Sequence, residues 1–192
     1  MGRAKDIYDY QMWELFDQYK NDVLSDDEYL MFQKDIVWNP EQEVAIATGL
    51  DYLNTPTKTD GPAFMLIDGK AGTGKTTVVN EILKRYKDAR GLSPKVYVTS
   101  TAGKAVDVIY KKTPLASDKG SLAAAIGYRP INGEWQKNPY KINKEPIRDV
   151  DIVIADECSM ISDTYYNELM AIIEDERKKG HDIKLFFLGD SG

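Results

Sequence analysis

Apolar and polar residues alternate in blocks from residue 63 onward, and these blocks predict strands and helices in regular succession. Short apolar runs predict strands at residues 63–67, 95–99, 152–155 and 183–188. Amphipathic segments between them predict helices at residues 75–90, 103–112 and 163–179. Apolar strands that alternate with helices are typical of a parallel sheet covered by helices on both faces. The pattern therefore predicts an α/β domain.

Two regions depart from this rhythm. Residues 1–38 are rich in acidic and aromatic side chains, at spacings that predict a helical N-terminal extension. Asn39 then caps a new helix, with Pro40 at its first position, which is expected to run to about Leu53. After a short helix at 121–126, residues 128–146 lose the helical period and contain the tight-turn signal Asn132-Gly133. The sequence thus predicts a main domain at residues 39–192 with a hairpin insertion at about 128–146.

The strongest chemical signal is a glycine-rich segment directly after the first predicted strand. Gly69-Lys70-Ala71-Gly72-Thr73-Gly74-Lys75-Thr76 fits the phosphate-binding pattern G-x-x-x-x-G-K-[ST]. Glycines let such a loop curl until its backbone N–H groups face anionic oxygens, and the following helix adds its positive dipole end. In this scheme Lys75 reaches the β- and γ-phosphates, and the Thr76 hydroxyl binds Mg²⁺. The alternative is a glycine-rich turn without a ligand, which the full match and its flanks disfavour.

A pair of acidic residues supports the same chemistry. Asp156 and Glu157 follow the apolar run 152–155, so they are expected at the carboxyl end of a buried parallel strand, where open α/β sheets bind ligands. Asp156 would hold Mg²⁺ through its water shell, and Glu157 would orient or deprotonate the attacking water. Taken alone, the pair would more often be a helix cap followed by a first-turn acid. The upstream phosphate loop reverses that preference.

Charge and composition narrow the class of protein further. The chain has 192 residues, of which 42% are hydrophobic, enough for one good core. Its net charge is −6, yet residues 61–150 carry 16 basic and 8 acidic residues, so the middle of the chain is a basic island and a candidate polyanion surface. No apolar stretch approaches the length of a membrane span, and the N-terminus has no apolar signal-peptide core. We therefore expect a cytoplasmic protein that does not contact a membrane.

The single cysteine and the single histidine carry little chemistry in this reading. One cysteine cannot form an internal disulfide, and Cys158 with His181 cannot make a zinc site. Cys158 follows Glu157, which favours packing beneath the site over a nucleophilic role. His181 follows the helix predicted at 163–179, which favours an exposed position at its C-terminal cap.

Five stretches of the chain occur in a recognisable order. They are Asn39-Pro40-Glu41-Gln42, residues 69–76, Ser100-Thr101-Ala102-Gly103-Lys104-Ala105, Asp156-Glu157-Cys158-Ser159-Met160 and Leu188-Gly189-Asp190. The set resembles the adenine-reading Gln motif, the phosphate loop, motif Ia, the D-E-x-S-M motif and the start of motif III of superfamily 1 helicases, in the RecD-like and phage Dda-like group. The resemblance covers about residues 39–192 and implies a RecA-like P-loop NTPase fold.

The resemblance also implies cofactors, partners and site residues, with ATP and Mg²⁺ as cofactors. The catalytic residues would be Lys75 and Glu157, and the metal ligands Thr76 and Asp156. The nucleotide would contact Gln42, Gly69, Ala71, Gly72, Thr73, Gly74, Lys75, Thr76, Thr77 and Asp190. Single-stranded and fork DNA would contact Thr101, Gly103, Lys104, Ser121, Tyr128 and Trp135.

The chain departs from the family pattern at the stretches that contact DNA. It has Ser100-Thr101-Ala102 where the family usually has A-P-T, and Ser121-Leu122-Ala123-Ala124 where the family often has T-I-H-S. It also stops before the Gln of motif III and before the second RecA-like domain. The resemblance therefore implies half of an ATP-dependent helicase that moves 5′ to 3′, in a bacterial cell or a phage-infected host. Because the arginines that stabilise the transferring phosphate come from the other half, we expect this chain to bind ATP with little turnover.

Two other functions use the same nucleotide pocket. An ATP-gated binding module or switch would need no strand translocation, and its activity would not respond to nucleic acid. Another kind of P-loop NTPase, such as a packaging motor or a kinase, would share residues 69–76 and Asp156 without requiring Gln42 or Gly103-Lys104-Ala105.

Overall fold

The computed structural model describes residues 36–57, 61–139 and 145–190. The chain divides into two compact units, Met1–Asn39 and Pro40–Gly192. All helices and strands described below belong to the second unit. The helical extension predicted at residues 1–38 lies almost entirely outside the described residues. Within the described residues, no helix combines the length and the apolar character that crossing a membrane requires.

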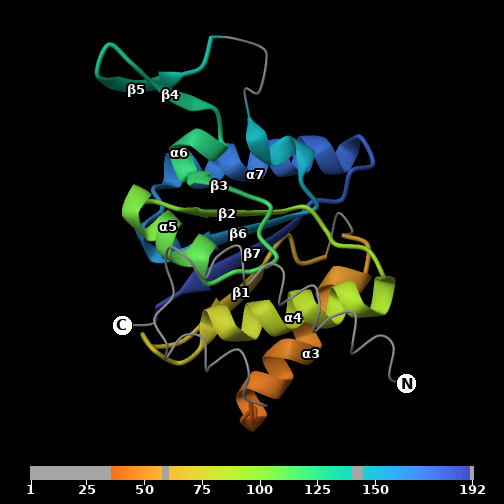
Figure 1. The fold of residues 1–192 in the computed structure, drawn as a ribbon. Coiled ribbons are helices and arrows are strands. Elements are labelled where there is room, and N and C mark those ends of the chain that lie inside the picture. Colours follow the sequence, from red (N-terminus) through yellow and green to blue (C-terminus); the bar gives the residue numbers. More distant parts are fainter. Residues whose placement is uncertain (1–35, 58–60, 140–144, 191–192) are drawn as a thin grey trace. The chain divides into compact units, whose positions relative to one another are not determined.

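Five parallel strands form the central sheet of the second unit (Figure 1). They are β1 (Met65–Asp68), β2 (Val96–Ser100), β3 (Asp118–Ser121), β6 (Ile152–Asp156) and β7 (Lys184–Gly189), in the order β1-β7-β6-β2-β3. The three inner strands, β7, β6 and β2, are buried along almost their whole length, as their continuous apolar sequences predict. The predicted parallel sheet is therefore confirmed.

Helices cover both faces of this sheet. In Figure 1, α3 (Pro40–Asn54), α4 (Lys75–Arg90) and α5 (Gly103–Lys111) lie below the sheet, and α6 (Leu122–Ala125) and α7 (Asp163–Lys178) lie above it. The connections β1-α4-β2 and β2-α5-β3 cross the sheet in one direction, whereas β6-α7-β7 crosses in the other. Because such crossovers are right-handed, a reversal of direction places the helices on the opposite face.

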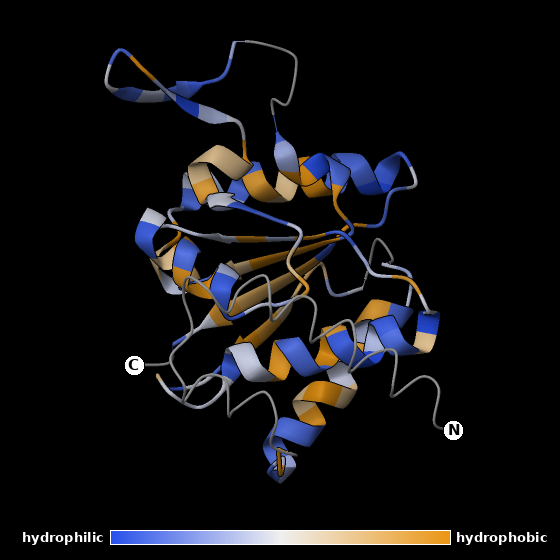
Figure 2. Cartoon of the chain, viewed as in Figure 1, coloured by the Kyte–Doolittle hydropathy of each residue, from blue (hydrophilic) through white to orange (hydrophobic). Residues whose placement is uncertain are grey.

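Alternate residues of the inner strands build a core on each face of the sheet. Phe186 of β7 packs edge-on against Tyr52 of α3, with their ring centroids 5.5 Å apart. Its neighbour Phe187 points to the other face, where it packs against Phe64 at 5.0 Å and joins the cluster formed with Leu169 and other residues of α7. Figure 2 shows the mostly apolar inner strands between helices that carry both apolar and polar residues.

The strand β3 was not predicted, because its sequence, Asp-Lys-Gly-Ser, has no apolar run. It forms at the edge of the sheet, where β2 would otherwise leave unpaired backbone groups, and its register pairs Tyr97 with Asp118 and Ser100 with Ser121. Backbone pairing and not side-chain burial therefore determines this element.

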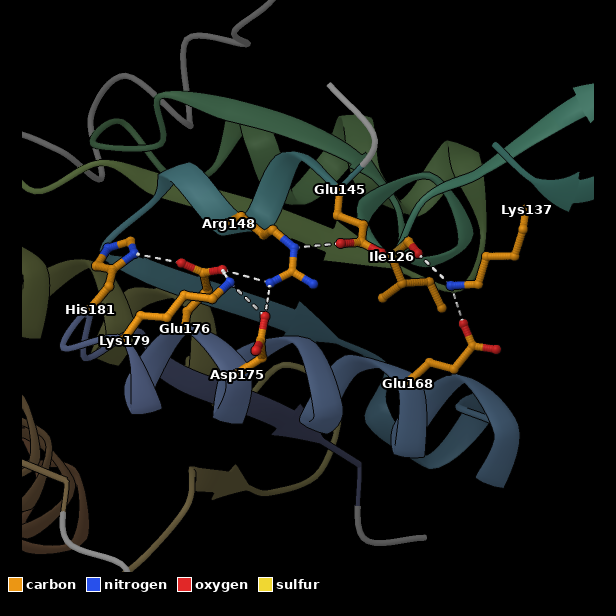
Figure 3. A network of polar contacts seen from close by, with 9 residues as sticks. All are labelled: Ile126, Lys137, Glu145, Arg148, Glu168, Asp175, Glu176, Lys179 and His181. Carbon is orange, nitrogen blue, oxygen red and sulfur yellow. Dashed lines mark hydrogen bonds and ion pairs between the residues drawn. The ribbon is translucent and has the colours of Figure 1, made fainter. Parts of the chain in front are cut away.

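The predicted hairpin is present as β4 (Tyr128–Ile131) and β5 (Glu134–Lys137). Its turn has positive φ angles at both central residues, 53° at Asn132 and 86° at Gly133, as a two-residue type I′ turn requires. The base of the hairpin is attached to α7, since Glu168 accepts a hydrogen bond from the Tyr128 hydroxyl at 2.8 Å and pairs with Lys137. Figure 3 shows that Lys137 also reaches the carbonyl of Ile126, at 2.9 Å.

A second polar cluster attaches the short 3₁₀ helix η1 (Pro146–Asp149) to the C-terminal end of α7 (Figure 3). Arg148 donates to Asp175 and Glu176, both at 2.6 Å, and to Glu145. Beyond α7, the backbone N–H of His181 donates to the carbonyl of Glu176 at 3.0 Å, which closes the helix as expected for a C-terminal cap. The His181 side chain is at the border between half-buried and exposed, and its Nδ1 lies 3.7 Å from Oε2 of Glu176.

We expect Gly120→Ala to lower the free energy of unfolding by about 1–3 kcal/mol, because overpacking a buried site forces its neighbours to shift. A Cβ on Gly120 of β3 would lie 2.1 Å from the hydroxyl of Tyr97, a side chain that is only 2% exposed. Denaturant unfolding measures the loss.

The Tyr97→Phe background provides the control, because it removes the hydroxyl that the new methyl group would meet. Burial raises the pKa of Tyr97 to about 12, so this change removes no charge. The cost of Gly120→Ala should be smaller in Tyr97→Phe than in the wild-type protein. Equal costs in the two backgrounds would contradict the predicted clash.

Candidate nucleotide-binding site

The predicted phosphate loop and the predicted acidic pair lie at the same edge of the sheet. The loop follows β1, the acidic pair ends β6, and β7 lies between these two strands. All three strands run parallel, so their carboxyl ends lie side by side. The chain leaves β1 toward one helical layer and leaves β6 toward the other (Figure 1), which is where open α/β sheets bind ligands.

The backbone of the loop has the geometry that a phosphate site needs. Gly72 and Gly74 have φ angles of 79° and 84°, left-handed values that residues with a Cβ rarely adopt. An ideal Cβ at Gly69 would lie 2.8 Å from Oγ1 of Thr73. The N-cap residue Gly74 has no side chain that could accept hydrogen bonds from the first-turn N–H groups of α4. These N–H groups can therefore donate to a ligand, and the end of a helix that carries them favours an anion.

The loop residues are accessible, as a binding surface must be. Ala71, Gly72 and Thr73 are exposed at the loop tip, and Thr77 is exposed in the first turn of α4. Thr76, the predicted metal ligand, is half-buried beside them.

Lys75 lies over the loop that it was predicted to serve. Its ammonium donates to the backbone carbonyls of Gly69 and Lys70, at 2.5 and 3.2 Å, and lies 3.8 Å from Oδ1 of Asp190. Asp190 directly follows β7, so the stretch predicted to resemble motif III does reach the phosphate loop. The Lys75 ammonium is therefore held by oxygen acceptors of the protein, and a bound phosphate would supply further acceptors or take the place of some of these.

Gln42 is also brought to the loop, from a position far away in the sequence. It lies in the first turn of α3, which packs on α4, and its Nε2 donates to the carbonyl of Thr73 at 3.2 Å. An ideal Cβ on Gly74 would lie 3.3 Å from the same nitrogen, so the amide and the loop are in close contact. The structure thus places Gln42 against the phosphate loop, and its contact with a base remains a prediction.

The acidic pair is held rigidly at the end of β6. Oδ1 of Asp156 accepts the backbone N–H of Glu157 at 2.9 Å. Burial raises the pKa of Asp156, and the charge of Glu157 adds to this rise, while the Glu157 N–H and the charge of Lys75 oppose it. A divalent cation bound there would compensate the buried charge.

Glu157 has an uncommon backbone conformation. Its φ of 55° lies in the left-handed region, which costs a residue with a side chain about 1–3 kcal/mol and tends to occur at functional sites. Its Oε2 accepts a hydrogen bond from the Ser100 hydroxyl, at the end of β2, at 3.1 Å. Ser100 was not among the predicted site residues. The signal that could have revealed it is its position at the carboxyl end of a strand next to β6.

The donor set fits Mg²⁺ better than a metal that needs many protein ligands. Mg²⁺ keeps several waters and is held by one or two protein oxygens together with phosphates, which suits Thr76 and Asp156. Among the described residues, no group of three or more His, Cys, Asp or Glu side chains is arranged to hold a metal by itself.

Cys158 lies beneath the site, in the short 3₁₀ helix η2 (Cys158–Met160). An ideal Cβ on Gly189 would lie 3.2 Å from both Sγ of Cys158 and Oδ1 of Asp68, so the floor of the site is closely packed. Burial raises the pKa of the Cys158 thiol, and the charges of Asp68 and Asp156 raise it further. A thiol held in its protonated form is a poor nucleophile, in agreement with the predicted packing role.

The residues predicted to contact DNA fall into two groups. Thr101 lies between β2 and α5, Gly103 and Lys104 are the first two residues of α5, and Ser121 ends β3, the strand next to β2. The Ser121 hydroxyl caps α6 by accepting the N–H of Ala124 at 3.3 Å. This group lies at the carboxyl edge of the sheet, where β2 is next to β6 with its acidic pair and β3 is one strand further away.

The second group lies on the hairpin, and its two members differ in exposure. Trp135 is 51% exposed on β5, opposite Pro130. Tyr128 lies at the hairpin base, where its hydroxyl donates to Glu168 and its ring packs against Tyr165 at 5.4 Å. Tyr128 therefore anchors the base of the hairpin to α7, whereas the Trp135 ring is exposed and could contact a ligand. DNA contact by either residue remains a prediction.

Comparison with known proteins identifies relatives of this chain. An uncharacterized protein of the archaeon Methanocaldococcus jannaschii is 28% identical over 131 residues, which cover 65% of this chain and 11% of that protein. An uncharacterized protein of Acanthamoeba polyphaga mimivirus is 28% identical over 170 residues, which cover 80% of this chain and 32% of that protein. The chain therefore spans a third or less of the length of these relatives.

Solved helicase structures share the fold. The Pif1 helicase from Candida albicans matches 81% of this chain and 33% of its own, with a TM-score of 0.51 and 22% identity. The Bacteroides Pif1 bound to single-stranded DNA matches 81% of this chain and 32% of its own, with a TM-score of 0.52 and 15% identity. At this identity the matches establish the fold, which is the RecA-like α/β fold predicted from the sequence. The model of the AAA_19 family, described as an AAA domain, matches residues 57–192, the segment that contains the phosphate loop and the acidic pair, and the chain belongs to this family.

Proposed function

We propose that this chain is the nucleotide-binding half of an ATP-dependent DNA helicase. The observation that carries the proposal is the convergence of Lys75, Asp190, Asp156 and Glu157 at the carboxyl ends of three adjacent parallel strands. This arrangement supplies a phosphate cradle, a cation over it, a metal ligand and a carboxylate able to act on water, which are the parts that phosphoryl transfer requires.

Each residue has a distinct part in the proposed hydrolysis. The loop N–H groups and Lys75 bind the β- and γ-phosphates, and Thr76 and Asp156 hold Mg²⁺, which neutralises charge that develops on the phosphates. Glu157 orients the attacking water. The arginine that completes such a site is expected from a second RecA-like domain outside this chain, and it contributes about 10³ to 10⁵ in rate. This half alone should therefore bind MgATP and turn it over slowly.

The proposed substrate is single-stranded or forked DNA. The support comes from fold relatives: one Pif1 structure is a complex with single-stranded DNA, and another concerns unwinding at forked double-stranded DNA by two Pif1 helicases. In this chain, the segment from Thr101 to Lys104 at the start of α5 and the exposed Trp135 offer two contact points. Movement from 5′ to 3′ follows the RecD-like resemblance, and so does the proposed location in the cytoplasm of a bacterial cell or a phage-infected host.

Stimulation by DNA provides the decisive test. In a full-length protein that carries both motor domains, single-stranded DNA should raise the ATPase rate, and fork DNA should be unwound only with hydrolysable ATP. An ATP-gated binding module would give an ATPase rate that does not change with DNA. That result would refute the helicase proposal and leave the nucleotide site intact.

Substitutions in the site should separate binding from hydrolysis. Lys75→Ala should abolish tight MgATP binding, because it removes the charge that compensates the phosphates. Glu157→Gln should keep that binding and eliminate hydrolysis. Titration with a fluorescent ATP analogue and a phosphate-release assay measure the two effects.

The exposed residues Lys178 and Glu174 of α7 provide charge-matched controls, as Lys178→Ala and Glu174→Gln, and both variants should behave like the wild type. If Lys75→Ala and Glu157→Gln lose nucleotide affinity equally, the two roles are wrongly assigned.

Gln42→Ala should weaken ATP binding more than GTP binding. An amide offers one donor and one acceptor, which match the N6 and N7 edge of adenine. Competition binding with ATP and GTP measures the preference, and Glu41→Ala, in the same helical turn, is the control. If the ratio of the two affinities stays the same in Gln42→Ala, Gln42 is a structural contact of the phosphate loop and not a base reader.

Trp135→Ala should reduce unwinding per ATP hydrolysed while leaving DNA-stimulated hydrolysis intact. The exposed ring can stack on an end base pair, and base–aromatic stacking contributes ~1–3 kcal/mol per base. A strand-separation assay run together with phosphate release measures the ratio. Gln136→Ala, on the opposite face of β5, is the control. If Trp135→Ala leaves the amount of DNA unwound per ATP hydrolysed unchanged, the ring has a packing role only.

A further inference from the structure

Ser100 and Glu157 form the one direct side-chain hydrogen bond that the structure gives between the end of β2 and the acidic pair. The Ser100 hydroxyl donates to Oε2 of Glu157 at 3.1 Å. The two residues belong to neighbouring strands, since Ser100 is the register partner of Asp156. We propose that Ser100 is a positioning residue, which fixes the Glu157 carboxylate so that its other oxygen faces the attacking water. This inference rests on the proposed function, because it assigns a partner to the proposed catalytic glutamate.

The backbone on both sides of this hydrogen bond is rigid. Ser100 is 1% exposed and is paired on both edges of β2, with Asp156 of β6 and with Ser121 of β3. At Glu157, the N–H donates to Asp156 at 2.9 Å and the carbonyl accepts from Met160 at 2.9 Å, which holds the left-handed conformation. The remaining freedom of Glu157 lies in its side-chain torsions, and its hydrogen bond with the Ser100 hydroxyl restricts them.

The hydrogen bond also leaves the chemistry available. Glu157 has two carboxylate oxygens, and Ser100 engages only Oε2. Among the residues that the structure describes, none donates a hydrogen bond to Oε1. A carboxylate anchored by one oxygen can present the other to a water at a constant place, which is the role of an outer partner of a reacting group. A carboxylate without that anchor samples several rotamers, and fewer of them are productive.

A neighbouring residue provides a close control. Thr99 precedes Ser100 on β2, is fully buried, and its hydroxyl has no hydrogen-bond partner within the described part of the chain. Since successive side chains of a strand point to opposite faces, Thr99→Val removes a buried hydroxyl from the same strand without affecting Glu157. A general effect of altering β2 would therefore appear in both variants, whereas a loss of positioning would appear only at Ser100.

The test compares Ser100→Ala, Ser100→Thr and Thr99→Val in the full-length protein, by steady-state ATP hydrolysis with saturating single-stranded DNA and by MgATP binding. Ser100→Ala should lower kcat by about 10- to 100-fold, as removal of outer-shell partners does elsewhere, with KM and the Kd for MgATP unchanged. Ser100→Thr keeps the hydroxyl and should restore most of the rate. Thr99→Val should match the wild type.

Two further measurements distinguish the ways in which the inference can fail. If Glu157→Gln abolishes hydrolysis while Ser100→Ala does not change kcat, the positioning role is wrong and the proposed function stands. If Glu157→Gln itself keeps hydrolysis, the proposed catalytic assignment fails. A rate in Ser100→Ala above the wild-type rate would also overturn the inference, because the hydrogen bond would then hold the Glu157 carboxylate away from the attacking water. In the double variant Ser100→Ala/Glu157→Gln, the loss should not exceed that of Glu157→Gln alone, as expected for residues that act as one unit.

Discussion

The parallel pairing of β1, β7 and β6 is the constraint on which the candidate site depends. The register sets Asp68 of β1 beside Gly189 of β7, and Ala155 of β6 beside Phe187 of β7. The phosphate loop, Asp190 and the acidic pair therefore emerge from three adjacent strand ends. Backbone hydrogen bonds fix these positions before any side chain contributes. A one-residue slip of β7 would turn its buried side chains to the opposite face, so the two apolar cores also maintain the site.

The charges at this edge leave the phosphate loop prepared for an anion. Asp190 is about half exposed, and an exposed ion pair contributes only about 0–1 kcal/mol, so little is lost when Lys75 exchanges Asp190 for a phosphate. The hydrogen bonds that Lys75 donates to Gly69 and Lys70 meanwhile hold the ammonium at the loop. The loop glycines cannot be replaced so easily, because Gly72 and Gly74 have left-handed conformations in which a Cβ is strained. The ion pair of Lys75 can thus be exchanged at little cost, whereas the backbone conformation of the phosphate loop requires its glycines.

The sequence predicted what periodicity and local motifs determine, and missed what only pairing in space determines. The inner strands, the hairpin turn at Asn132-Gly133 and the start of α4 carry local signals strong enough to be predicted. The strand β3 has no apolar residues, so nothing local indicated it. Ser100 was missed for a related reason: its contact with Glu157 joins residues 57 positions apart, and only the order of the strands makes them neighbours. Gln42 could be predicted only through family resemblance.

The helix α7 connects the two regions where function is proposed. It begins shortly after Glu157, with Ser162 as its N-cap, and Glu168 lies in its second turn. Glu168 accepts the Tyr128 hydroxyl and pairs with Lys137, so the base of the hairpin is attached to the helix that follows the acidic pair. The phosphate loop, in contrast, leads into α4 on the other face of the sheet (Figure 1). A displacement of α7 relative to the sheet would therefore move the base of the hairpin with it, while Asp156, paired with Ser100 in the sheet, would keep its place beside the phosphate loop.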